Sequence, residues 1–355
     1  MKRFSALMLL CMAGSAAFAA DTLKITAIDV EGGFATLYVT PRGHSLLIDT
    51  GWPAGMGGVR PGQSAPPTPS SAERIAAAVK AAGLARIDFL LVTHYHVDHV
   101  GGAVELLSLL PVGTVLDHGP NREASTPDAN PKFLAMEPAT LYPRYLQAIG
   151  RRPHRVMKPG ETLSIDGLMI TTVNSDGAVL VAPLGKGEPG TGCAAATTND
   201  DLGGEENPRS LGVLMTWGRA RILSLGDTTW NVENSLVCPR DLIGPVDLMF
   251  ADNHGTENAN SPTLLGTVQP RAVVFNNGAA KGAAAQSIAA VQASPRIKGI
   301  WQLHFAEQHP DVNAPQDNIV NLSGREDDRH PLQIAVDRDG SLVFTNPRTG
   351  ASTRY

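Results

Sequence analysis

The sequence has few cysteines, few aromatic residues and, beyond its N-terminus, no long hydrophobic run. Three of its 355 residues are cysteine and 5% are aromatic, whereas 43% are hydrophobic, as in an ordinary globular core. No later stretch approaches the roughly 20 consecutive apolar residues that cross a bilayer. The chain also lacks a Walker loop, a dinucleotide fingerprint set between a strand and a helix, and a Gly-x-Ser-x-Gly elbow. These absences argue against a membrane-embedded protein and against several common classes of enzyme.

Positive charge is also scarce. The 29 Lys and Arg residues are outnumbered by 34 Asp and Glu residues, and the formal net charge is −5 at pH 7. Nonspecific nucleic-acid binding depends on basic side chains that neutralise phosphates. We therefore expect no stable nucleic-acid binding, and a small molecule or an ester as the partner.

The N-terminus has the features of a secretory signal. Two basic residues precede an apolar run from Ala6 to Phe18, and Ala17-Phe18-Ala19 is a small-x-small cleavage pattern. Cys11 follows Leu10 rather than a small residue, which disfavours a lipoprotein anchor. Residues 1–19 are predicted to be a signal peptide, and the mature protein is predicted to be periplasmic or secreted, without a membrane anchor.

Two cysteines remain after this cleavage, Cys193 and Cys238. An even number of cysteines in an exported protein favours a disulfide. Burial as two free thiols is the alternative. We favour the disulfide because Cys193 lies in a glycine-rich loop that has little else to hold it.

One short segment, Thr93-His94-Tyr95-His96-Val97-Asp98-His99, concentrates metal-ligand chemistry. It follows the apolar run 87–92, so the pattern predicts a strand that ends in a ligand loop. Alternation along an extended chain places His94 and His96 on one side, and Asp98 and His99 beyond the turn would reach a second ion. Imidazole and carboxylate are ligands that zinc prefers. A His-rich surface turn, or hydrogen-bonded core histidines, would explain a single histidine better than this spacing.

The second half of the sequence supplies two more ligand candidates at strand ends. The segments 211–217 and 220–225 predict a hairpin that ends in Gly226-Asp227, and 247–251 predicts a strand that ends in Asp252-Asn253-His254-Gly255. The glycine allows a tight turn and leaves the Asp227 carboxylate free to bridge two ions. A helix N-cap is the alternative role for Asp227.

The pattern His94-x-His96-x-Asp98-His99 resembles the signature of the metallo-β-lactamase-fold hydrolases. The resemblance implies an α/β fold, an αββα sandwich with a one- or two-metal site at one edge, as a single domain over residues 20–355. It implies two Zn²⁺ ions per chain, with Mn²⁺ or another divalent ion as the alternative. Asp49 would support the ligand loop from behind, or form a turn. The implied metal ligands are His94, His96, Asp98, His99, Asp227 and His254.

Residues 23–305 resemble one branch more than others, the extracellular hydrolase domain of the competence protein ComEC and its small secreted relatives. The resemblance rests on Gly226-Asp227 and on His254-Gly255 with Ser261-Pro262 beyond. Where that branch often has His-His-Gly, this chain has Asn253-His254-Gly255. The family's usual further histidine is also missing between residues 176 and 226. His118 and His304, each at a predicted strand end, are therefore candidates for a further ligand, a substrate contact or a supporting group.

These observations favour a metal-dependent hydrolase in which Asp98 and Asp227 are the catalytic carboxylates. Two ions that share Asp227 would lower the pKa of a bridging water from 15.7 towards ~7 and make hydroxide available at neutral pH. Phosphoesters, phosphodiesters in particular, are slightly favoured over β-lactams or lactones. A noncatalytic metal-binding or interaction protein is the alternative class. The loops 53–70, 120–138 and 185–208 are expected to determine the substrate.

Overall fold

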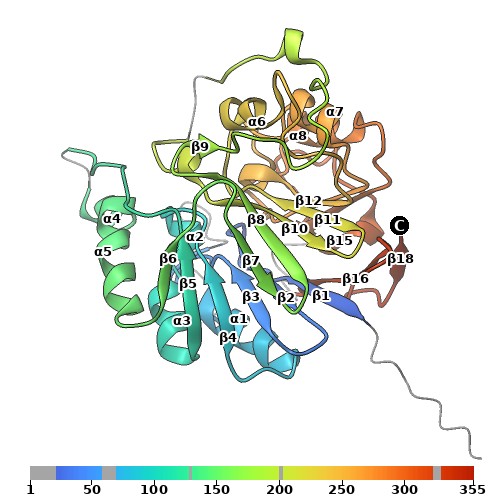
Figure 1. Cartoon of the computed structure of the whole chain (residues 1–355). Helices are drawn as coiled ribbons and strands as arrows, with labels where there is room; N and C mark the ends of the chain where they lie inside the picture. Colours follow the sequence, from blue (N-terminus) through green and yellow to red (C-terminus); the bar gives the residue numbers. More distant parts are fainter. Residues whose placement is uncertain (1–20, 58–68, 128–129, 200–202, 323–328) are drawn as a thin grey trace, which may run out of the picture.

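The computed structural model of the chain describes residues 21–57, 69–127, 130–199, 203–322 and 329–355. Two β-sheets stack face to face, and helices cover the outer side of each (Figure 1). The predicted αββα sandwich is therefore confirmed. The predicted signal segment 1–19 lies outside the described residues, as do residues 58–68 of the loop 53–70.

The first sheet combines strands from both ends of the chain, in the order β18-β17-β16-β1-β2-β3-β4-β5-β6. β1, β2 and β3 pair antiparallel, as their alternating sequences predict, whereas β3 to β6 run parallel. The C-terminal hairpin of β16 and β17 pairs antiparallel with β1. The strands are β1 (Thr22–Ala27), β2 (Thr36–Val39), β3 (Ser45–Ile48), β4 (Ile87–Leu91), β5 (Val112–Asp117), β6 (His154–Val156), β16 (Leu332–Asp337), β17 (Leu342–Thr345) and β18 (Ser352–Arg354).

The second sheet has the order β15-β14-β13-β12-β11-β10-β8-β7, and β9 pairs with β8. The predicted hairpin of β10 and β11 is antiparallel, and β11 to β15 run parallel. The strands are β7 (Thr162–Ile165), β8 (Leu168–Ser175), β9 (Ala178–Val179), β10 (Gly212–Trp217), β11 (Ala220–Ser224), β12 (Leu248–Phe250), β13 (Ala272–Phe275), β14 (Gly299–His304) and β15 (Ile319–Asn321).

The helices connect parallel strands, and side-chain caps begin α1, α4 and α7. Ser70 and Glu73 form a capping box at the start of α1. The α-helices are α1 (Ser71–Ala81), α2 (Val97–Val100), α3 (Ala103–Leu109), α4 (Pro131–Leu134), α5 (Pro138–Ile149), α6 (Trp230–Val237), α7 (Pro262–Val268) and α8 (Ala285–Gln292). The 3₁₀ turns are η1 (Cys193–Ala195), η2 (Asn207–Arg209), η3 (Asp252–Gly255) and η4 (Gln316–Asn318).

Three apolar clusters hold these layers together. One, which includes Tyr38, Trp217 and Phe344, fills the space between the two sheets. The second packs α1, α3 and α5 against the first sheet, and the third packs α6, α7 and α8 against the second. The interior between the sheets is therefore a packed core, and polar chemistry is confined to the edge. Among the described residues, no helix has the length and apolar character needed to cross a membrane.

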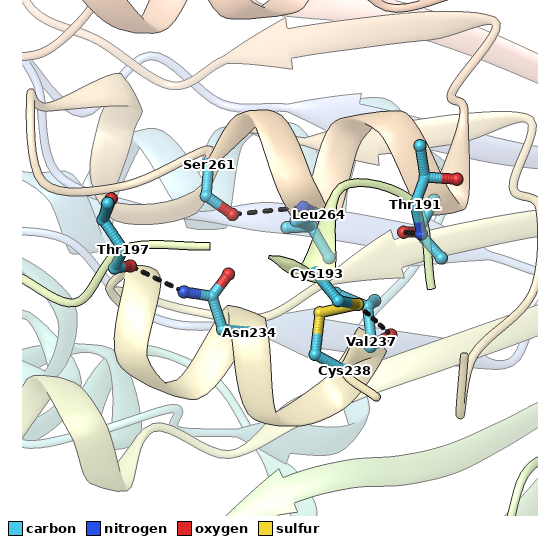
Figure 2. The surroundings of a disulfide bond; sticks show 9 residues. Thr191, Cys193, Thr197, Asn234, Val237, Cys238, Ser261 and Leu264 are labelled. Carbon is cyan, nitrogen blue, oxygen red and sulfur yellow. Dashed lines mark hydrogen bonds between the residues drawn. A yellow bond between two sulfur atoms is a disulfide. The ribbon is translucent and has the colours of Figure 1, made fainter. Parts of the chain in front are cut away.

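The loop 185–208 is attached to α6. Cys193 and Cys238 form a disulfide across 45 residues, with their Cα atoms 5.6 Å apart (Figure 2). A second attachment lies one turn earlier on the helix, where Asn234 Nδ2 donates to Thr197 O at 2.8 Å (Figure 2). The predicted disulfide thus joins this loop to the helix that begins three residues after Asp227.

Candidate metal centre

The histidine motif and the ligand candidates of the second half meet at one edge of the sandwich. The motif follows the carboxyl end of β4, Asp227 follows β11, and His254 follows β12. A backbone hydrogen bond joins the two halves here, because Leu211 N donates to Thr93 O at 2.8 Å. Residues that are far apart in the sequence thereby form one buried site.

Four of the predicted ligands form a compact group. The ligand atoms of Asp98, His99, Asp227 and His254 all lie within 4.8 Å of one another, and all four residues are buried. His254 Nε2 lies 3.0 Å from Asp98 Oδ2 and 3.4 Å from Asp227 Oδ2. His99 Nε2 lies 3.1 Å from Asp227 Oδ1. Two imidazoles and two carboxylates are a sufficient donor set for a divalent ion.

Hydrogen bonds behind the two imidazoles orient their free nitrogens toward each other. His254 Nδ1 lies 2.9 Å from Asn276 O, a carbonyl that can only accept, so this nitrogen carries a hydrogen. His99 Nδ1 lies 2.8 Å from Asp49 Oδ2, which also only accepts when ionised. The Nε2 atoms, 3.1 Å apart, therefore present lone pairs to each other when the rings are neutral. This arrangement is repulsive without a cation, and it fits a metal ion.

His94 and His96 form a second pair of facing nitrogens. Thr93 Oγ1 donates its hydrogen to Asp49 Oδ2 at 2.7 Å, so it accepts from His94 Nδ1 at 3.0 Å. His94 Nε2 then faces His96 Nδ1 at 3.0 Å. The predicted placement of both side chains on one side is confirmed. The pair would supply two nitrogen donors to a first ion, beside the four-residue group.

A tight turn presents the carboxylate of Asp227. Gly226 has φ +72°, and a Cβ at this position would lie 2.8 Å from the Ser210 side chain, so a larger residue would be strained and crowded. The cap of α6 is Thr229 rather than Asp227. The N-cap role considered for Asp227 is thus excluded, and its carboxylate faces the histidines.

The model of the metallo-beta-lactamase superfamily matches residues 28–264, a span that contains the motif, Asp227 and His254. The chain belongs to the metallo-beta-lactamase superfamily. A comparison with curated proteins gives no significant match.

Solved structures of the superfamily are similar to this chain at low sequence identity. The metallo-beta-lactamase fold protein YhfI from Bacillus subtilis is 13% identical, with a TM-score of 0.45, over 79% of this chain and 96% of that one. Tm1679, a metal-dependent hydrolase of the beta-lactamase superfamily, is 12% identical, with a TM-score of 0.43, over 79% and 95%. CmlA, a diiron beta-hydroxylase from Streptomyces venezuelae, is 18% identical, with a TM-score of 0.40, over 82% of this chain and 49% of its own length. These similarities carry no information on activity.

The carboxylates of this superfamily member are held in the form that binds metal. Burial alone would raise the pKa of Asp98, but the charges of Lys281 and His99 hold it well below its usual value. Burial alone would also raise the pKa of Asp227, but the charges of His99 and His254 hold it well below its usual value. Both groups are therefore ionised at neutral pH.

The imidazoles divide into two kinds. Burial, together with the charges of His99 and His96, lowers the pKa of His94 well below its usual value, so this ring is neutral at neutral pH. Burial also opposes protonation of His99, but the charges of Asp227 and Asp98 raise its pKa well above the usual value. Protons on the four-residue group and a metal ion therefore compete for the same nitrogens, and binding of the ion would release protons.

Two groups near the ligands were not found from the sequence. Glu123, in the loop after β5, places Oε2 3.4 Å from His96 Nε2 and accepts the Glu205 backbone N–H at 2.8 Å. Lys281, after β13, contacts Asp98 Oδ2 through its Nζ atom. Neither residue lies in a recognisable motif. The only sequence signal is that each follows the carboxyl end of a parallel strand by a few residues, where sites of α/β proteins gather.

The two further histidine candidates are engaged elsewhere. His118 Nε2 lies 3.1 Å from Glu206 Oε2, and His304 Nε2 lies 2.8 Å from Asp29 Oδ1. Neither belongs to the group of Asp98, His99, Asp227 and His254. His304, Asp29 and Glu31 form a second group of potential ligands, but Arg74 pairs with Glu31 at 2.9 Å and already supplies positive charge there. The structure therefore places neither His118 nor His304 in the four-residue group, although the His118 ring lies 4.7 Å from the ring of Tyr95 in the motif, and Glu206 accepts the Tyr95 backbone N–H.

Proposed function

We propose that the protein is an exported metal-dependent hydrolase that acts on phosphoesters, with phosphodiesters as the preferred class. The observation that carries this proposal is the pair of facing imidazole couples, His94 with His96 and His99 with His254, the second of which lies against the Asp227 carboxylate. Facing ring nitrogens at this distance share a proton or a metal ion, and the ionised carboxylates supply the negative charge that would balance a divalent cation.

Asp227 is the residue that would connect two ions. Burial lowers the pKa of His94, and the charge of Asp227 opposes this; for His96, burial is outweighed by the Glu123 hydrogen bond, and the charge of Asp227 adds to the raised pKa. Asp227 therefore lies within electrostatic range of that pair. Its two oxygens lie 3.1 and 3.4 Å from the Nε2 atoms of His99 and His254. Among the described residues, His99 Nε2 approaches Oδ1 without an aligned hydrogen bond, so this oxygen could also coordinate an ion. Divalent ions held here would supply Lewis acidity, which lowers the pKa of water and polarises an ester oxygen.

The chain's own residues would orient and protect this chemistry. Asp49 and Asn276 fix the ring hydrogens of His99 and His254, and burial keeps the four-residue group away from bulk water. The completeness of this donor set favours catalysis over a noncatalytic binding role. The ComEC-like order of Gly226-Asp227 and His254-Gly255 supports phosphoesters ahead of lactams or lactones. The signal-like N-terminus and the Cys193–Cys238 disulfide support a periplasmic or secreted location.

The proposal is tested on zinc-reconstituted protein with Asp227→Ala as the variant. Wild type is expected to hold about two zinc ions per chain in elemental analysis and to hydrolyse bis-p-nitrophenyl phosphate. The variant is expected to lose much of the metal and to be slower by roughly three or more orders of magnitude, because the nucleophile depends on the ions. Asp339→Ala is the control, since this exposed carboxylate accepts the Ser341 backbone N–H within its own turn.

Three outcomes would overturn parts of the proposal. Turnover of a chromogenic cephalosporin or an acyl lactone, without turnover of the phosphodiester, would show that the substrates are β-lactams or lactones instead of phosphoesters. Equal rates in wild type and Asp227→Ala on every substrate would remove this site as the catalyst. A metal content near zero after reconstitution would remove the metallohydrolase proposal altogether.

A further inference from the structure

Lys281 is a cation at the rim of an otherwise buried acidic and imidazole-rich site. Its Nζ atom contacts Asp98 Oδ2, and its side chain is 34% exposed, whereas the side chains of Asp98 and His254 are 8% and 0% exposed. Nζ also lies 5.2 Å from the centre of the Trp52 ring. Lys281 is thus a partly exposed residue that is in direct contact with the buried cluster of candidate ligands.

The backbone holds Lys281 in this position. Gly278 N donates to Lys281 O at 2.9 Å, which closes the turn that carries the lysine. A Cβ at Gly32 would lie 2.9 Å from Gly278 N, so this turn packs directly against the loop between β1 and β2. On its other side, Ala283 N donates to His254 O at 2.9 Å. The ammonium group is therefore built into the site from a fixed turn, unlike an ordinary surface lysine.

Trp52 forms the other side of this rim. It follows the Asp49-Thr50-Gly51 turn at the end of β3, and Gly33 brings the opposite loop close, since a Cβ there would lie 3.0 Å from Trp52 Nε1. A cation near an aromatic face is stabilised in that place. Lys281 and Trp52 together form a half-exposed surface that is charged at one side and apolar at the other.

Charge balance decides what this lysine can bind. Asp98 is now shared by Lys281, His99 and His254. The two charges of a divalent ion on Asp98 would be neutralised by the carboxylates of Asp98 and Asp227, which would leave the ammonium charge of Lys281 unbalanced within the group. Lys281 would then favour an additional anion, and its exposure allows that anion to come from solvent.

We propose that Lys281, backed by Trp52, is the anion subsite of the metal centre and binds a charged oxygen of the substrate, such as a non-bridging phosphoryl oxygen. This inference rests on the proposed function, and it deepens it by naming the group that selects anionic over neutral esters. The lysine makes no bond in the reaction. It holds the anion while the metal ligands act on the ester.

The test compares Lys281→Met with Lys281→Arg in zinc-reconstituted protein. Methionine keeps the length of the side chain without its charge, and arginine keeps the charge. Lys298→Met, at an exposed position, is the matched control. Three quantities are measured in each protein: zinc content, binding of inorganic phosphate by calorimetry, and the kinetics with bis-p-nitrophenyl phosphate and with neutral p-nitrophenyl acetate.

In Lys281→Met, zinc content is expected to stay at the wild-type level while phosphate affinity falls by about ten- to a hundredfold. KM for bis-p-nitrophenyl phosphate is expected to rise by a similar factor, with little change in kcat and none for the neutral ester. Lys281→Arg is expected to restore most of the phosphate binding. Lys298→Met is expected to behave as wild type.

Several results would overturn the subsite. Zinc loss in Lys281→Met would make the lysine a structural partner of Asp98, and a fall in kcat with unchanged phosphate affinity would make it a proton donor. Zinc-loaded wild type that binds no phosphate would also refute it. If phosphate binding depends on Lys281 but no phosphoester is turned over, the subsite stands and the proposed function fails.

Discussion

Asp49 Oδ2 lies 2.8 Å from His99 Nδ1, and Asp49 Oδ1 accepts the Thr93 backbone N–H at 2.7 Å. One buried carboxylate thus fixes both the ring hydrogen of a ligand and the start of the ligand loop. These are the hydrogen bonds expected of a carboxylate that supports the candidate ligand loop. A substitution that keeps the shape of the Asp49 side chain but removes its charge tests this support of His99.

Asp49→Asn is expected to lower zinc affinity by roughly 10- to 100-fold, because the amide holds the His99 ring hydrogen less well and makes its free nitrogen less basic. Competition with a chromogenic zinc chelator measures the change. Asp88→Asn is the control: Asp88 lies near the opposite end of β4, where its Oδ2 accepts the Ser45 N–H at 2.9 Å. Equal zinc affinity in wild type and Asp49→Asn would show that Asp49 holds the backbone at Thr93 and has no effect on metal binding by His99.

Glu123 is expected to support His96 as Asp49 supports His99. Its Oε2 atom lies 3.4 Å from His96 Nε2, which leaves Nδ1 to face His94. Glu123→Gln is expected to weaken binding of the first ion by roughly tenfold or more while the second ion is retained. Stepwise zinc titration separates the two events. Glu205→Gln is the matched control, because this neighbouring carboxylate is 69% exposed. A uniform loss of both ions would argue against the assignment of Glu123 to His96.

The buried carboxyl pair Glu233 and Asp252 predicts a pH dependence of stability. Burial raises the pKa of Glu233 to about 7, and burial together with the Glu233 charge raises that of Asp252 well above its usual value. Glu233 accepts the Asn260 and Ser261 backbone N–H groups, each at 2.6 Å. These bonds favour the charge on Glu233 and the proton on Asp252.

A carboxyl group with a raised folded-state pKa binds its proton more tightly in the folded chain than in the unfolded chain. Its contribution to stability is therefore complete below the unfolded pKa of about 4.3 and is lost as the pH rises through about 7. In EDTA, the free energy of unfolding of wild type is expected to fall between pH 5 and 8 by about 1–3 kcal/mol from this pair. Asp252→Asn, which keeps a neutral donor beside Glu233, is expected to remove the part of the slope that comes from Asp252, while the part from Glu233, whose pKa burial raises, remains. Urea unfolding at each pH measures the free energy of unfolding of both proteins. The same pH dependence in wild type and Asp252→Asn would contradict the prediction.

The Cys193–Cys238 disulfide is expected to leave no reactive thiol in the denatured, unreduced mature protein. Two reactive thiols per chain would refute the bond. Its closed segment of 45 residues predicts a loss of about 3–4 kcal/mol of stability in the Cys193→Ser/Cys238→Ser double variant. Zinc content is expected to be unchanged, because neither cysteine contacts the ligand group. Urea unfolding and elemental analysis measure the two effects separately.

The sequence by itself determined the layered fold and the core of the site. The alternation of buried and exposed residues along a strand predicted the β10–β11 hairpin, whereas the αββα arrangement was implied by the family resemblance of the histidine motif. The motif from His94 to His99 is local, since a strand end and one turn bring its ligands together. Gly226-Asp227 and His254 were recognisable because each ends a strand.

Only the tertiary structure decided which remote side chains complete the site. Lys281 meets Asp98 across 183 residues, and Glu123 meets His96 from a loop without periodicity. His118 and His304 occupy strand ends, as a ligand would, yet Glu206 and Asp29 engage them instead. Hydrophobic periodicity encodes which face of an element is buried. The distance between two loops depends on how the sheets twist and pack, and no periodic pattern in the sequence reports that arrangement.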